Sequence, residues 1–155
     1  YTGVVVARVS PAAAFGATHT FQVGEDGGDI GNALTELTNG RGPDLAVEVS
    51  GSPAALTSAV DWLGVGGRCL TLGYVYPGSD VAFDAHKLVT KCLTLQGLHN
   101  YRPEALGDAL AFVSATRTRF HFHALVAPTY PLSDLDAAFA HAAGGDAIRV
   151  GVTPV

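Results

Sequence analysis

Three short segments that contain glycine or polar residues follow apolar runs in this 155-residue chain. They are Ser50-Gly51-Ser52, Gly73-Tyr74-Val75 and Leu98-His99-Asn100-Tyr101. If the runs form parallel strands, these segments follow the carboxyl ends of the strands, where open α/β sheets bind ligands. Glycine in two of them would let a ligand approach the backbone closely, although a plain turn needs glycine equally. We therefore take this edge as the candidate site, with ordinary turns as the alternative.

The histidines do not form a pattern typical of a metal site. His121 and His123 are spaced to share one face of a strand, and the other four are scattered. His99 lies nearest the candidate edge and could relay a proton there. We interpret it as a surface-loop histidine, and we predict neither a catalytic nor a metal-binding residue in this chain.

The two cysteines, Cys69 and Cys92, each lie in an apolar segment with the character of a strand. A disulfide framework would need more cysteines, and a structural zinc site would need close pairs of them. We therefore predict two reduced core residues in a cytoplasmic protein.

Composition narrows the class of protein. Apolar residues make up 48% of the chain and charged residues 15%, with a net charge of −5. This predicts one compact globular domain rather than a disordered chain. The basic residues are scattered, which argues against nucleic acid as a partner, and no apolar run is long enough to cross a membrane.

Strand and helix patterns alternate along the chain. Apolar residues at helical spacing predict helices around Ile30–Leu37, Leu56–Leu63, Leu106–Val113 and Leu135–Ala142. Short β-branched runs predict strands at Val4–Val6, Thr18–Val23, Leu45–Val49, Arg68–Leu72, Leu93–Leu95 and Ile148–Val152. Such alternation predicts an α/β fold with a doubly wound, largely parallel sheet and helices on both faces.

Local signals mark the helix ends. Ser52 is placed to cap the second helix with Pro53 in its first turn, and Pro103 begins the third. Ser133 and Asp136 have the spacing of a weak capping box for the last helix, which Gly144-Gly145 should end.

Several strings follow one another in order: GATHTF, ELTNGRGPDLAVEVSGSPAAL, GGRCLTLGYV, LTLQGLHNY and PLSDLDAAFAHAAGGDAIRVGVTP. Together they resemble the C-terminal half of the medium-chain, zinc-dependent alcohol dehydrogenase family. GLHNYRPEAL and AFAHA are most similar to proposed zinc-binding alcohol dehydrogenases associated with phosphonate catabolism. The likeness covers nearly the whole chain, and its specificity comes from the order of the strings.

The resemblance implies a Rossmann-type domain for NAD or NADP over residues 1–117, and a return segment over residues 118–155 that joins the catalytic domain. It also implies which residues bind the cofactor. The ribose would lie by the loop after the fourth family strand, and the carboxamide end by the loops after the fifth and sixth. These residues are Val49, Ser50, Gly51 and Ser52, then Leu72, Gly73 and Tyr74, then Leu98 and Asn100.

Two arginines complete the implied cofactor site. Arg149 resembles a residue that pairs with the pyrophosphate, because a guanidinium meets phosphate oxygens in pairs; the alternative is an exposed charge at a strand end. Arg8 follows the family's second strand, where an acidic residue would select NAD. An arginine there could pair with the 2′-phosphate, so NADP is slightly favoured over NAD.

The sequence also departs from the family pattern. It contains no Gly-x-Gly-x-x-Gly turn, and the family's first strand is missing. A sheet without its central strand would expose unpaired backbone. We therefore expect a piece of a longer dehydrogenase, with the zinc ligands in an N-terminal domain outside this sequence.

Three functions remain open at this point. The first is the cofactor-binding part of a zinc-dependent alcohol dehydrogenase that acts on an alcohol or aldehyde and is inactive alone. The second is a non-catalytic nucleotide-binding or dimerisation module. The third is another doubly wound nucleotide binder, such as a methyltransferase, which the ordered strings disfavour. The strand around Leu93–Leu95 would lie at a sheet edge, and the family resemblance implies a homodimer through it.

Overall fold

The computed structural model describes residues 2–3, 10–22 and 29–154 of the chain. These residues form two compact units, of which one is Asp29–Pro103 and the other contains the described residues of 1–28 and 104–155. The expected strand at Val4–Val6 and the candidate cofactor residue Arg8 lie outside the described residues. The predicted domain boundary after residue 117 stays a prediction.

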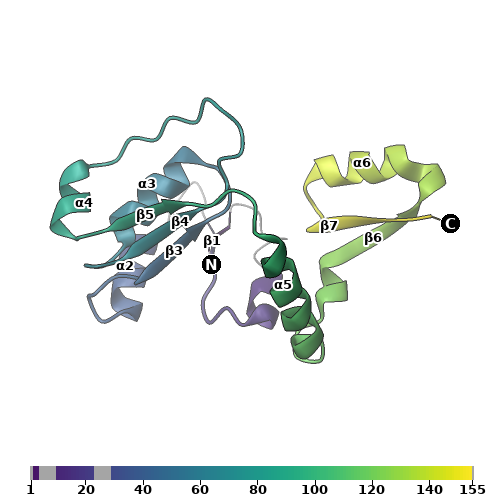
Figure 1. Cartoon of the computed structure of the whole chain (residues 1–155), viewed down its shortest axis with the longest axis horizontal. Helices are drawn as coiled ribbons and strands as arrows, with labels where there is room; N and C mark the ends of the chain where they lie inside the picture. Colours follow the sequence, from purple (N-terminus) through teal and green to yellow (C-terminus); the bar gives the residue numbers. More distant parts are fainter. Residues whose placement is uncertain (1, 4–9, 23–28, 155) are drawn as a thin grey trace. The chain divides into compact units, whose positions relative to one another are not determined.

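A three-stranded parallel sheet is the centre of the Asp29–Pro103 unit. Its strands are β3 (Leu45–Glu48), β4 (Arg68–Thr71) and β5 (Thr94–Gly97), with β4 in the middle (Figure 1). The strands run in register, so that Glu48 pairs with Thr71 and Thr71 pairs with Gly97. The α/β fold with parallel strands is thus confirmed, and β5 begins one residue later than expected.

Three helices accompany this sheet. They are α2 (Ile30–Leu37), α3 (Pro53–Trp62) and α4 (Ala85–Thr90). The Asp29 side chain caps α2 by accepting from the Asn32 amide, and Pro53 opens α3 as predicted. Ser52 is the N-cap residue of α3, yet its hydroxyl makes no capping hydrogen bond. Sequence periodicity missed α4, because six residues are too few to show a helical stripe.

The core of this unit lies between α3 and one face of the sheet. Leu56, Val60, Leu63 and Cys69 form its buried cluster, with Ala46 and Leu95 packed against them. On the opposite face of β3, Leu45 and Val47 are 60% and 52% exposed. Both α2 and α4 contact α3, so within this unit the helices lie on one face rather than on both.

The prediction for Cys92 is wrong. Cys69 is a buried, free thiol as expected, but Cys92 is exposed and has a φ of 52°. The reason is local, because the residue lies in the turn between α4 and β5 and not in a strand. Its apolar neighbours gave it the character of a strand residue.

The other unit contains two short parallel sheets. Strands β1 (Thr2–Gly3) and β2 (Phe21–Gln22) form one, and β6 (Val126–Pro131) and β7 (Arg149–Thr153) form the second. The helices of this unit are η1 (Ser10–Phe15), α5 (Pro103–Thr116), η2 (Phe122–Leu125), η3 (Leu132–Asp134) and α6 (Leu135–Gly144). Helix α6 connects β6 to β7, which makes a β-α-β unit.

In this unit two local expectations are wrong and one is confirmed. His121 and His123 lie at η2 and not in a strand. Their ring centroids are 5.8 Å apart in an edge-to-face arrangement. The capping box is wrong, because Asp134 is the N-cap of α6 and its side chain makes no capping bond. Gly145 ends α6 in the left-handed conformation, as predicted. Strand β6 was missed because it contains two prolines, which normally argue against a strand.

Candidate functional site

The three candidate segments do follow the carboxyl ends of three neighbouring strands. Since β3, β4 and β5 are parallel and end in register, Val49–Ser52, Leu72–Val75 and Leu98–Tyr101 leave the same edge of the sheet. Backbone bonds fix the start of two of them: the Leu72 amide donates to the Glu48 carbonyl at 2.9 Å, and the Leu98 amide donates to the Thr71 carbonyl at 3.0 Å. The structure therefore brings together the segments that the sequence singled out.

The buried carboxylate of Glu48 accepts hydrogen bonds from the first segment. Its side chain is only 5% exposed, and Oε1 accepts from the Ser50 amide at 2.7 Å and from the Ser50 hydroxyl at 2.5 Å. The Gly51 amide donates to the same oxygen at 3.0 Å. Three donors of one turn thus converge on a single buried oxygen, which satisfies a charge that would otherwise be costly to bury.

Gly51 and Gly73 allow the first two segments to lie in close contact. Gly51 has a φ of 72°, and a Cβ on it would lie 2.6 Å from the Gly73 carbonyl oxygen. A Cβ on Gly73 would lie 2.8 Å from Oε2 of Glu48. Packing between the two loops therefore requires both glycines. The space beside each glycine is filled by the protein, which agrees with ordinary turns and not with close approach of a ligand.

Tyr74 adds a second link between the same loops. Its hydroxyl donates to the Ser52 carbonyl at 2.7 Å. Burial raises the pKa of Tyr74 above its ordinary value, and the nearby Glu48 and Cys69 raise it further. Burial and Glu48 likewise raise the pKa of Cys69. The phenol is thus held in its neutral, donating form.

The remaining predicted residues line the surface of this edge. Ser50 uses its hydroxyl internally, since it donates to Glu48 and accepts from the Ser52 amide at 3.2 Å. Val49 and Leu98 are 61% and 47% exposed, and Asn100 has a φ of 58°. The edge therefore offers apolar side chains and loop backbone to a ligand, above a rigid turn.

Arg149 lies in the other unit, at the start of β7. Its guanidinium is exposed, and Nη1 donates to the Ile148 carbonyl at 3.0 Å. The expected pairing with a pyrophosphate stays a prediction. His99 is also exposed, in agreement with a loop histidine.

Glu48 is the one organising residue of the site that sequence reasoning missed. It ends an apolar strand and lies two residues before the Ser-Gly-Ser turn, with Val49 between them. That spacing was a usable signal, because a carboxylate at a strand end can accept from the amides two and three residues ahead.

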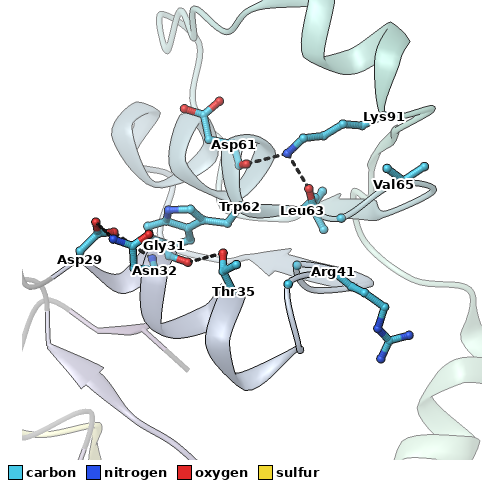
Figure 2. Close-up of a pocket in the computed structure, with 13 residues that line it drawn as sticks. Asp29, Gly31, Asn32, Thr35, Arg41, Asp61, Trp62, Leu63, Val65 and Lys91 are labelled. Atoms are coloured by element: carbon cyan, nitrogen blue, oxygen red, sulfur yellow. Dashed lines mark hydrogen bonds between the residues drawn. The ribbon is translucent and has the colours of Figure 1, made fainter.

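A cavity of about 450 Å³ lies elsewhere in the Asp29–Pro103 unit (Figure 2). Gly42, Val65 and Lys91, which line it, precede β3, β4 and β5, so it opens at the amino edge of the sheet. The Lys91 ammonium donates to the carbonyls of Asp61 and Leu63 at 2.9 and 2.7 Å. This cavity is therefore separate from the candidate edge, and its lysine serves to close the end of α3.

Within residues 2–3, 10–22 and 29–154, no three His, Cys, Asp or Glu side chains are grouped to hold a metal ion. No helix in the described part of the chain has the length and apolar character to span a bilayer.

The contact between the glycines makes a stability prediction. Gly51→Ala introduces a methyl group at positive φ and against the Gly73 carbonyl, whereas Gly66→Ala does so at a φ of 77° with no atom within 4 Å. We expect Gly66→Ala to cost about 1–2 kcal/mol of unfolding free energy, and Gly51→Ala about 1–3 kcal/mol more. Urea unfolding of both variants measures the difference, and equal losses would contradict the packing role.

The raised pKa of Tyr74 makes a pH prediction. Because the pKa of Tyr74 is higher in the folded protein than in the unfolded chain, where it is about 10, its protonated phenol stabilises the fold fully at pH values below about 10. This contribution to stability is lost as pH rises through the pKa of the folded protein. Tyr74→Phe should be about 1 kcal/mol less stable than the parent at pH 8, through loss of the bond to Ser52. The gap should shrink as pH rises above about 10 in urea titrations. A gap that stays constant as pH rises would refute a part-buried phenol that is held neutral.

Comparison with known proteins identifies the family. Residues 3–115 match the family model described as zinc-binding dehydrogenase. A sorbitol dehydrogenase from Halalkalibacterium halodurans is 28% identical over 127 residues, which are 82% of this chain and 36% of that protein. This chain thus spans little more than a third of that relative's length.

Solved structures agree with this match. An alcohol dehydrogenase zinc-binding domain protein from Burkholderia ambifaria superposes with a TM-score of 0.83 and 29% identity, over 97% of this chain and 40% of that one. An alcohol dehydrogenase from Thermotoga maritima shares the fold, with a TM-score of 0.88 at 22% identity over 99% of this chain and 42% of that one. The resemblance seen in the ordered strings is confirmed at the level of the family, and the chain belongs to the zinc-binding dehydrogenases.

Proposed function

We propose that this chain is the dinucleotide-binding part of an NAD(P)-dependent alcohol dehydrogenase. The whole enzyme would transfer a hydride between an alcohol or aldehyde and the nicotinamide. The observation that carries the proposal is the meeting of three loops at the carboxyl edge of β3, β4 and β5 in a chain of the zinc-binding dehydrogenase family. In open α/β sheets this edge is the ligand-binding edge.

The described residues suit the nicotinamide and ribose of a dinucleotide. Val49 and Leu98 offer exposed apolar surface for the nicotinamide and ribose faces, and the loop backbone around Gly73 and Asn100 offers polar groups to the carboxamide. When bound, the nicotinamide ring accepts or supplies the hydride. The task of this chain is to bind and orient that ring, and its rigid turn limits how the ring can move.

The described residues do not fit a catalytic zinc site, because they contain no suitable group of three ligands. We therefore derive no step through zinc from this chain and assign its ligands to another part of the whole enzyme. The 155 residues alone should show negligible turnover of alcohols.

The finer assignments are also proposals. Arg8 favours NADP, and the strings GLHNYRPEAL and AFAHA favour the subgroup associated with phosphonate catabolism. A cytoplasmic location agrees with two cysteines that are both free thiols.

Titration of the 155-residue chain with NADH and NADPH tests the proposed function. We expect both to bind, NADPH more tightly, with no alcohol oxidation by the chain alone. Arg149→Ala should weaken binding by about tenfold, through loss of a charge-assisted contact to phosphate. Arg117→Ala, which removes the same charge from an exposed position, is the matched control.

Two results would contradict this account. Binding of neither dinucleotide would favour a non-catalytic or dimerisation module. Rapid turnover by the isolated chain would show that the catalytic groups are present here.

We further propose a homodimer through β5. Among the described residues β5 pairs only with β4, so its other edge presents unpaired backbone groups, and the strand is a candidate for pairing with its copy. Sedimentation equilibrium should give twice the chain mass of 15.9 kDa at micromolar concentrations. A monomer at all concentrations up to the millimolar range would refute this pairing for the chain.

A further inference from the structure

We propose that Glu48 is the positioning residue of the dinucleotide site: its buried carboxylate sets the shape of the Ser50–Ser52 turn and holds that turn against the loop of Gly73. This inference rests on the proposed function. No part of it requires Glu48 to touch the ligand.

The charge of Glu48 is compensated by donors of the turn that follows it. The ion pair found among the described residues joins Lys87 to Asp61 and does not involve Glu48. Instead, the Ser50 amide, the Ser50 hydroxyl and the Gly51 amide donate to Glu48. Because a buried carboxylate needs such donors, the side chain and the turn depend on each other.

The same carboxylate also lies against the neighbouring loop. The Gly51 amide also lies 3.3 Å from Oε2, and that oxygen is so close to Gly73 that a Cβ there would meet it at 2.8 Å. Glu48 thus lies beneath both loops at the point where they touch. At position 48, a larger side chain, or one that directs a donor at the Gly51 amide, would separate the two loops.

The turn continues directly into the proposed binding surface. Ser50 Oγ accepts from the Ser52 amide, and the Ser52 carbonyl accepts from Tyr74. A change at Glu48 therefore passes through Ser50 to Ser52 and Tyr74, both of which are predicted to lie beside the cofactor. Displacements of about 1 Å at such positions are large enough to affect ligand binding strongly.

Two substitutions test the proposal in the 155-residue chain. Glu48→Gln keeps the size and one acceptor, but it places an NH₂ group where Oε1 or Oε2 now faces N–H donors. Glu48→Ala removes all acceptors. We expect affinity for NADPH to fall by several-fold for Glu48→Gln and by on the order of tenfold or more for Glu48→Ala.

Thr71→Val is the matched control. Thr71 pairs with Glu48 on the adjacent strand, and its hydroxyl donates to the Gln96 carbonyl at 3.4 Å without touching the turn. It should lower the unfolding free energy slightly and leave NADPH affinity unchanged. Amide hydrogen exchange gives a second readout: Ser50 and Gly51 should exchange faster in Glu48→Gln, while Gly66, whose amide donates to Lys91 in a distant turn, should not change.

The outcomes separate the two proposals. If the parent binds NADPH and Glu48→Gln binds it equally well, the positioning role is refuted and the proposed function stands. If Thr71→Val loses as much affinity as Glu48→Gln, the effect is one of general stability and the positioning role is refuted as well. If the parent binds no dinucleotide, the proposed function fails and its positioning residue fails with it, whatever the exchange rates show about the turn.

Discussion

A single buried carboxylate links two of the three loops at the proposed binding edge of this molecule. Glu48 ends β3 beneath the sheet edge and satisfies its charge with donors of the turn that follows. Without it, the Ser50 and Gly51 amides would need other acceptors, and the close contact between Gly51 and Gly73 would lose its support. The arrangement of the first two loops at this edge depends on these contacts.

This constraint explains the unusual local composition. Two glycines are needed where two loops touch, and Gly51 must also adopt a positive φ. Tyr74 then spans the same gap through its hydroxyl. The two glycines, which first suggested room for a ligand, instead allow the loops to pack against each other. The proposed ligand surface lies outside them, at exposed side chains such as Val49 and Leu98.

Much of this was predictable from the sequence, and the exceptions have physical reasons. The strands at Leu45–Glu48 and Arg68–Thr71 and the helix after Ser52 follow from β-branched runs, apolar spacing and Pro53. Cys92 was misplaced because its apolar neighbours do not reveal a turn residue with positive φ. Glu48 was missed although its position two residues before Ser50 was a usable signal, and which nearby amides it binds follows only from the folded turn.

The central claim is that a nicotinamide dinucleotide binds at the carboxyl edge of β3, β4 and β5. Chemical-shift mapping of backbone amides during addition of NADPH tests it most directly. The account predicts the largest changes in Val49–Ser52, Leu72–Val75 and Leu98–Tyr101, with none around Trp62 and Lys91 at the opposite cavity. Changes concentrated at that cavity, or absent altogether at saturating ligand, would contradict it.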